Sequence, residues 1–220
     1  MLRRLTLTPT SWDVIWSLVQ RVLVVNAGVA LTNLPLLAAL SIVAQPWRYP
    51  VFFGALSLSL GPAVVAAFGY LHGDGEKLRD FARAYRRHFA RALGRWTLTV
   101  GLLAVLLVDV AALHDTAFGP TVVPLLVVTS VLTVATGLLA LALLVLRPDL
   151  GLLASLRLAV YAAVRRAWLS LLTLVVLLAA VTVVNRAPLL GLATVPGFAL
   201  IVAWSNTRAS LSLIKEVSPG

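Results

Sequence analysis

Long runs of apolar residues recur along this chain, and they restrict its fold more than any other feature. A helix needs roughly 20 apolar residues to cross a hydrocarbon core about 30 Å thick, and several runs reach that length. Sixty per cent of the 220 residues are hydrophobic and 12% are charged, whereas about 25% of the residues of a soluble domain are charged. The sequence therefore predicts an all-α, polytopic membrane bundle that forms a single domain over residues 1–220.

Charged residues and Pro/Gly turn signals divide the apolar sequence into six predicted spans. Short turns join the first span to the second, the third to the fourth and the fifth to the sixth, so these three turns lie on one side of the membrane. Both termini and two longer linkers then lie on the other side. The predicted spans are about 22–44, 50–71, 96–113, 121–146, 167–184 and 188–207.

Basic residues are distributed unequally between these two sides. All but two of the eighteen Lys and Arg residues belong to the termini and the long linkers, while the tight turns hold only Arg48 and Arg186. Loops that remain in the cytoplasm are enriched in Lys and Arg. The asymmetry predicts a multi-pass membrane protein with both termini in the cytoplasm.

The first long linker, "GDGEKLRDFARAYRRHFARALGRW" (residues 73–96), holds seven basic residues. Its apolar and aromatic residues recur at steps of three and four, which is the spacing of one helical face. Asp74 is the expected N-cap, and Asp80 is placed to pair with Arg83. The pattern predicts an amphipathic helix over about 75–93 that lies on the membrane, or against neighbouring helices, before the chain turns into the third span.

The remaining faces of this predicted helix carry arginines. Each basic residue near an anionic leaflet contributes about 1 kcal/mol of attraction, so the arginines predict contact with a bilayer that has an anionic cytoplasmic leaflet. A protein partner is the alternative. The predicted contact residues are Arg79, Arg83, Arg86, Arg87, Arg91 and Arg95.

The second long linker repeats this plan more weakly. It predicts a second amphipathic helix over about 149–166, and like the first linker it ends with arginine shortly before a tryptophan, Trp168. The two linkers and their flanking spans suggest a degenerate internal repeat. Shared Leu/Val/Ala composition explains the similarity equally well.

A few polar residues lie inside the predicted spans. Asp109 is a carboxylate near the outer end of the third span. It either plays a structural role, reaching the outer interface or bonding to a neighbouring helix, or it forms a proton or cation site. Asn26, Asn33 and Thr99 are its possible neighbours in that second interpretation. Asparagines in membrane helices more often bond across packed helices. Kinks or hinges are expected at four prolines: Pro35, Pro62, Pro124 and Pro196.

Signals for enzymatic chemistry are absent from the sequence. It contains no cysteine, no phosphate-binding loop and no nucleophile elbow, and none of its three histidines has a second ligand at metal-binding spacing. Its basic residues flank apolar spans, so nucleic acid is not an expected partner. We therefore expect neither catalysis nor a cofactor or metal.

Three groups of residues form recognisable motifs: Asn26 with Pro35 nine positions later, Gly61 and Pro62 in "GPAVVAAF", and Phe81, Tyr85 and Phe89. These groups resemble the YesL-like family of bacterial membrane proteins, whose molecular function is unknown. One departure is Val29, where the family often has Trp. Members are often encoded beside carbohydrate uptake systems, so the resemblance implies a location in the bacterial cell membrane, a role in sugar uptake and a sugar ABC transporter as a possible partner.

Two functions remain open from the sequence. The first is an accessory or scaffold protein associated with carbohydrate uptake, whose basic cytoplasmic helix contacts lipid or a partner. The alternative is a small transporter or permease subunit in which the cytoplasmic helices act as coupling elements. The spans offer few polar groups to line a solute pathway, which favours the first function.

Overall fold

The computed structural model describes residues 11–43, 45, 48–73, 77–186 and 188–217, and all regular structure within these ranges is helical. The predicted all-α fold is therefore confirmed. In chain order the helices are α1 (Ser11–Thr32), α2 (Leu34–Ile42), α3 (Pro50–Ser57), α4 (Leu60–His72), α5 (Leu78–Leu113), α6 (Gly119–Leu146), α7 (Leu152–Arg165), α8 (Ala167–Arg186) and α9 (Pro188–Val217).

Within the part of the chain that the structure describes, four helical stretches are long and apolar enough to cross a membrane. The helix α7 and the adjoining Ala167–Val183, which meet at 94°, make a fifth if this pair is one span. Such lengths and compositions are those of a multi-span helical membrane protein. The six predicted spans are thus confirmed in part. The four stretches are Ile15–Thr32, Pro50–His72, Leu78–Leu113 and Gly119–Leu146.

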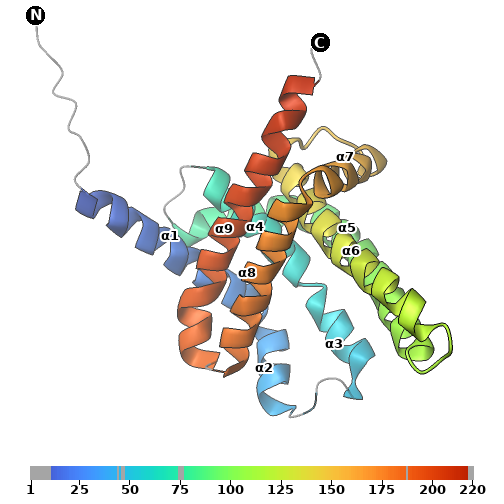
Figure 1. The fold of residues 1–220 in the computed structure, drawn as a ribbon. Helices are drawn as coiled ribbons and strands as arrows, with labels where there is room; N and C mark the ends of the chain where they lie inside the picture. Colours follow the sequence, from blue (N-terminus) through green and yellow to red (C-terminus); the bar gives the residue numbers. More distant parts are fainter. Residues whose placement is uncertain (1–10, 44, 46–47, 74–76, 187, 218–220) are drawn as a thin grey trace, which may run out of the picture.

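The ends of these helices separate into two groups in Figure 1. The end of α2, the turn between α5 and α6 and the start of α9 lie in the lower half of the view, whereas the start of α5, all of α7 and the end of α9 lie in the upper half. This arrangement places the predicted short turns together and the two long linkers together.

The first two predicted spans are each broken. Asn33 separates α1 from α2, and Leu58 and Ser59 separate α3 from α4. Pro35 and Pro62 fall in the first turns of α2 and α4, where a missing N–H costs no helical hydrogen bond. The expected discontinuities at these two prolines are confirmed, and the chain resumes helical structure just before each of them.

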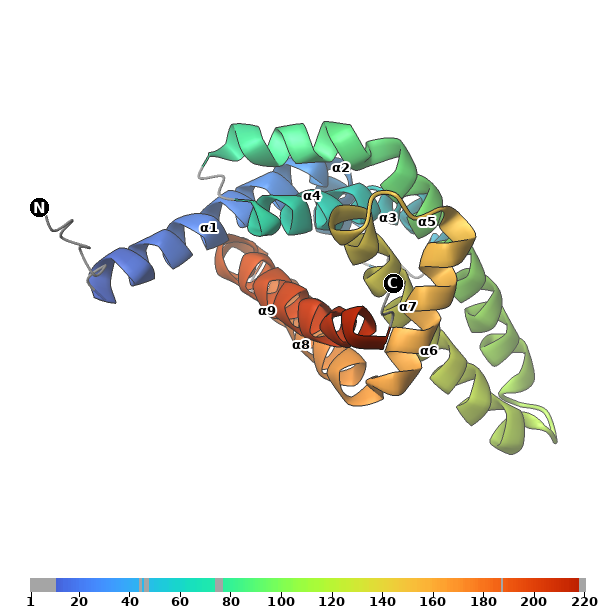
Figure 2. The same ribbon diagram turned by 90° about the horizontal axis from the view of Figure 1, so that it is seen from above.

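The prediction of a separate basic helix over 75–93 is wrong. The basic sequence and the third span form the single 36-residue helix α5, which bends about midway along its course in Figure 2. Gly94 alone does not end a helix, and no proline follows it before the apolar sequence begins. The N-cap is Lys77 and not Asp74. Asp74 lies outside the described residues.

The main core forms where α1, α4, α5, α6 and α9 meet. Phe68 and Trp204 lie at its centre with ring centroids 5.1 Å apart, and Phe81 joins them from α5. Small residues such as Ala66 and Ala67 allow the helices to approach closely, as is common in membrane bundles. The basic half of α5 is therefore part of the folded core.

The apolar half of α5 pairs with α6 and is covered by few other helices (Figure 2). Leu102, Val105 and Val108 are exposed there. So many exposed aliphatic side chains on one helix would be unfavourable in water but are expected in contact with lipid tails. This region therefore supports assignment to a membrane.

Candidate functional site

The apolar stripe of the basic sequence packs against protein. Phe81 is 2% exposed, and its ring lies so close to α1 that a Cβ atom on Gly28 would be 2.6 Å from it. A Cβ atom on Gly69 of α4 would likewise lie 3.1 Å from the Cβ of Ala84. The sequence predicted this basic segment either on the membrane or against neighbouring helices, and the structure shows it against neighbouring helices.

Farther along the stripe the aromatic residues become more exposed. Tyr85 is partly buried and Phe89 is exposed, and their ring centroids are 5.3 Å apart. These two residues and Phe81 carry the family resemblance, but only Phe81 belongs to the core. The stripe therefore leads from the core to the edge of the molecule.

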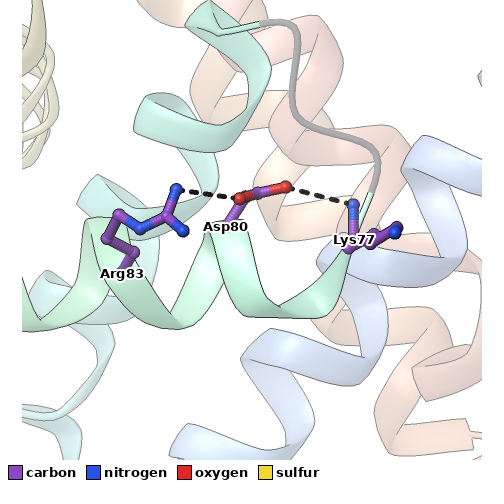
Figure 3. Close-up of polar contacts among 3 residues, drawn as sticks. All are labelled: Lys77, Asp80 and Arg83. Atoms are coloured by element: carbon purple, nitrogen blue, oxygen red, sulfur yellow. Dashed lines mark hydrogen bonds and ion pairs between the residues drawn. The ribbon is translucent and has the colours of Figure 1, made fainter.

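Four of the predicted contact arginines lie on the open face of α5: Arg79, Arg83, Arg86 and Arg87 are all exposed. Asp80 accepts a hydrogen bond from the Lys77 N–H at 3.4 Å and one from the Arg83 guanidinium at 3.1 Å (Figure 3). The predicted Asp80 to Arg83 pair is confirmed. We call these four arginines the arginine face.

Arg91 and Arg95 have a different environment, because they lie against the segment that joins α6 to α7. Arg91 donates to the carbonyl oxygen of Pro148 at 3.4 Å. Arg95 is 7% exposed and donates to the carbonyl oxygens of Ala140 at 3.0 Å and Leu150 at 3.3 Å. The six arginines predicted as one set therefore divide into four on the open face and two that donate to carbonyl oxygens of α6 or of the segment after it. Of these two, Arg91 is exposed and Arg95 is buried.

Burial and neighbouring positive charge alter the titration of two groups in the basic half of α5, which precedes the apolar stretch beginning at Trp96. Burial, with smaller contributions from Arg87 and Arg91, lowers the pKa of His88. Burial and then the charge of Arg91 lower the pKa of the Arg95 guanidinium. A guanidinium nevertheless stays charged at neutral pH, so Arg95 remains cationic.

The polar side chains of the first two predicted spans bond to each other. Asn33 is 2% exposed, and its Oδ1 accepts a hydrogen bond from the Ser59 hydroxyl at 2.7 Å. The break between α3 and α4 also frees the carbonyl oxygen of Ser57, which accepts a bond from the Trp96 indole N–H at 3.0 Å. The two breaks therefore meet and satisfy one another's polar groups.

Asn26 makes a separate contact. Its Oδ1 accepts a hydrogen bond from the backbone N–H of Gly197, the residue after Pro196 in α9. A Cβ atom on Gly197 would lie 2.7 Å from the Val22 carbonyl oxygen, so only glycine fits this crossing of α1 and α9. Asn26 thus bonds across two packed helices, as asparagines in membrane helices more often do.

The structure does not show Asp109 joined to the polar residues considered as its neighbours. Asn26 and Asn33 bond to the groups described above, and Thr99 donates to the Arg95 carbonyl oxygen and packs on Gly137. Among the described residues, Asp109 has neither a hydrogen bond nor an ion pair. Its side chain is half-buried near the end of α5, the environment expected of a carboxylate that reaches the interface.

The contacts that sequence reasoning missed involve residues with weak sequence signals. Ser57 and Ser59 occur in "SLSL", which resembles any apolar segment with small polar residues. Trp96, at the end of the first linker, packs closely on α4, because a Cβ atom on Gly61 would lie 2.4 Å from the Cβ of Trp96. Gly61, noted only for the family resemblance, was the available signal for this close crossing.

No group of three or more potential metal ligands occurs among the described residues. The chain matches no protein-family model, and searches of the curated proteins and of the solved structures found no match. The resemblance to the YesL-like family stays a prediction from the residues that carry it.

Proposed function

We propose that this chain is an accessory or scaffold protein of the bacterial cell membrane. In this proposal the arginine face of α5 lies in the cytoplasm, where it contacts the anionic leaflet or an acidic surface of a protein partner. The proposal assigns no catalytic activity to the chain. It places both termini and both long linkers on the cytoplasmic side, following the distribution of Lys and Arg.

The observation that carries the proposal is the contrast between the two sides of the basic half of α5. The part of its apolar side around Phe81 and Ala84 is occupied by α1 and α4, so that part is not available for insertion into lipid. Its other side presents four exposed arginines, of which only Arg83 has an ion pair among the described residues. A rigid helix that displays unpaired guanidinium groups suits recognition of carboxylates or phosphates.

The resemblance to the YesL-like family adds a biological setting to this proposal. It implies association with carbohydrate uptake, and a sugar ABC transporter is then the partner to test first. The charge of the arginine face would attract an acidic surface on such a partner.

The test is purification of the chain in mild detergent together with a co-expressed sugar ABC transporter from the same genome. A stoichiometric complex that is lost when Arg83, Arg86 and Arg87 are all changed to Gln supports the proposal. The control is a variant with Arg157, Arg165 and Arg208 changed to Gln, which removes the same charge from α7 and α9. Equal loss in both variants, or no complex with the parent chain, contradicts partner docking at the arginine face.

The paired helix breaks favour a second candidate, a small transporter or permease subunit. Transporters commonly bind solutes beside discontinuous helices, and the breaks at Asn33 and Ser59 are in direct contact. Solute flux through vesicles that contain only the purified chain would support this candidate over the first. If flux occurs, the Asp109→Asn variant tests whether Asp109 forms a proton or cation site. Such a site requires the variant to differ from the parent chain in flux and in the pH dependence of flux.

A further inference from the structure

Arg91 and Arg95 line an open groove at the level where the apolar sequence of two helices ends. The apolar half of α5 begins at Trp96, and the apolar sequence of α6 ends at Leu146. The groove has a volume of about 440 Å³ and lies between α5 and the segment that follows α6. Its lining includes Arg91, Gly94, Arg95, Asp149, Gly151 and Leu152.

The positive charge of this groove is not neutralised by the protein. Arg95 is only 7% exposed, yet both acceptors of its hydrogen bonds are neutral carbonyl oxygens. The groove also contains one carboxylate, Asp149, which lies 3.8 Å from Arg147 and forms no ion pair with Arg91 or Arg95. Burial of an uncompensated cation is unfavourable, so an anion in the groove would relieve it.

The start of α7 adds to this positive potential. Gly151 is the N-cap of α7, and it provides no side-chain hydrogen bond to the first turn, which also contains no acidic residue. The first N–H groups of a helix lack partners within the helix and form the positive end of its dipole. Because Gly151 and Leu152 line the groove, this helix end and both arginines surround the same space.

We propose that this groove binds the phosphate group of an anionic phospholipid. Guanidinium groups and helix N-termini are both suited to phosphate oxygens. The groove lies where apolar sequence gives way to charged sequence on α5 and α6, which is the depth at which lipid headgroups lie. The inference goes beyond the proposed function, because it holds whether or not the arginine face captures a partner.

Native mass spectrometry of the full chain in detergent tests this site with two lipids, phosphatidylglycerol and phosphatidylcholine. We expect the parent chain to bind a first phosphatidylglycerol more tightly than phosphatidylcholine. Arg91→Gln should weaken that first binding step by about tenfold, as expected for a charge-assisted hydrogen bond. The control, Arg208→Gln, removes the same charge from an exposed position on α9, outside both the groove and the arginine face, and should weaken this step much less.

Gly151→Asp provides a second test that does not depend on removing an arginine. A Cβ atom at this position would meet nothing within 4 Å, and aspartate is a favourable N-cap, so the fold should be retained. Its carboxylate would nevertheless repel a phosphate group, and we expect weaker binding of the first phosphatidylglycerol. Unchanged binding in both Gly151→Asp and Arg91→Gln overturns the site.

Two further outcomes would also overturn the inference. If Arg208→Gln weakens the first binding step as much as Arg91→Gln, the attraction is spread over the basic surface and no discrete site exists, although the proposed function would survive. If inorganic phosphate binds to the parent chain and displaces phosphatidylglycerol at similar concentrations, the ligand is free phosphate and not lipid. Failure to capture a transporter would leave the lipid result unaffected.

Discussion

The two long linkers of this chain have similar sequences but fold differently. Each is basic and amphipathic, and each ends with arginine shortly before tryptophan. The first continues without interruption into the apolar half of α5, whereas α7 ends at Arg165 and meets α8 at 94°. Local sequence therefore does not decide whether such a linker joins the following span or turns away from it.

Packing around the two tryptophans explains the difference. Trp96 lies against Gly61 and donates to the Ser57 carbonyl oxygen, so α4 holds the middle of α5. Trp168 is 71% exposed and has no such neighbour, and Arg166 leaves helical geometry with φ of −123° and ψ of 49°. Arg166 then donates to the Ala209 carbonyl oxygen of α9 at 2.8 Å. A close tertiary contact thus accompanies the continuous helix at one junction, and its absence accompanies the break in the other.

The largest expected effect comes from the aromatic residue at the centre of the first linker. Phe81→Ala removes a side chain that is 2% exposed, and we expect a loss of about 3–5 kcal/mol in the free energy of unfolding. Tyr161→Ala in α7 is the matched change, and it should cost less than about 1 kcal/mol because Tyr161 is exposed. Unfolding by sodium dodecyl sulfate in mixed micelles measures both, and equal losses would contradict the contrast between the linkers.

A substitution at the contact between α4 and α5 should have the next largest effect. In Gly61→Ala the new Cβ would lie 2.4 Å from the Cβ of Trp96, and forced separation of the two helices should cost about 1–3 kcal/mol. Gly94→Ala on α5, two residues before Trp96, meets nothing within 4 Å and should be neutral or slightly stabilising. The same unfolding measurement distinguishes them, and a stable Gly61→Ala variant would show that this crossing is looser than described.

The tryptophan substitutions should have a smaller effect. Trp96→Phe removes the indole N–H that bonds to Ser57 and should cost about 1–2 kcal/mol, mainly by leaving a carbonyl oxygen unpaired. Trp168→Phe removes no described hydrogen bond and should leave the free energy of unfolding unchanged. Circular dichroism during detergent unfolding avoids dependence on tryptophan fluorescence. Equal sensitivity at the two positions would remove the explanation given above for the bent junction.

The smallest effect concerns pH. Because the pKa of His88 is lowered in the folded chain, the unfolded chain binds a proton more readily. The stability linked to His88 is therefore complete above the unfolded pKa of about 6.5 and declines as pH falls below it. We expect His88→Gln to reduce the loss of stability between about pH 7.5 and 5.5. Identical pH profiles for the parent and the variant would contradict this assignment.

Much of the fold follows from composition and periodicity. Apolar length predicted the positions of α6 and α8 within a few residues, and the three- and four-residue spacing correctly grouped Phe81 with the other residues of its stripe. Proline positions indicated where the first two spans break. These features depend on local sequence, so they can be recognised without knowledge of neighbouring helices.

The remaining features depend on contacts between distant segments. The continuity of α5 requires the pairing of Gly61 with Trp96, and the bond from Ser59 to Asn33 joins residues 26 positions apart. The division of the arginines has the same origin, because Arg95 turns inward to carbonyl groups on α6 and beyond. Periodicity identifies the face on which such residues lie but not which segment will cover it.

The central claim is that the arginine face lies open in the cytoplasm while the stripe behind it is packed against α1 and α4. Because the chain contains no cysteine, labelling of Arg86→Cys by a membrane-impermeant maleimide measures this directly. We predict rapid labelling in inside-out vesicles and almost none in sealed right-side-out vesicles, with Phe81→Cys protected in both. Labelling of Arg86→Cys from the outside, or equal labelling at the two positions in inside-out vesicles, would contradict the claim.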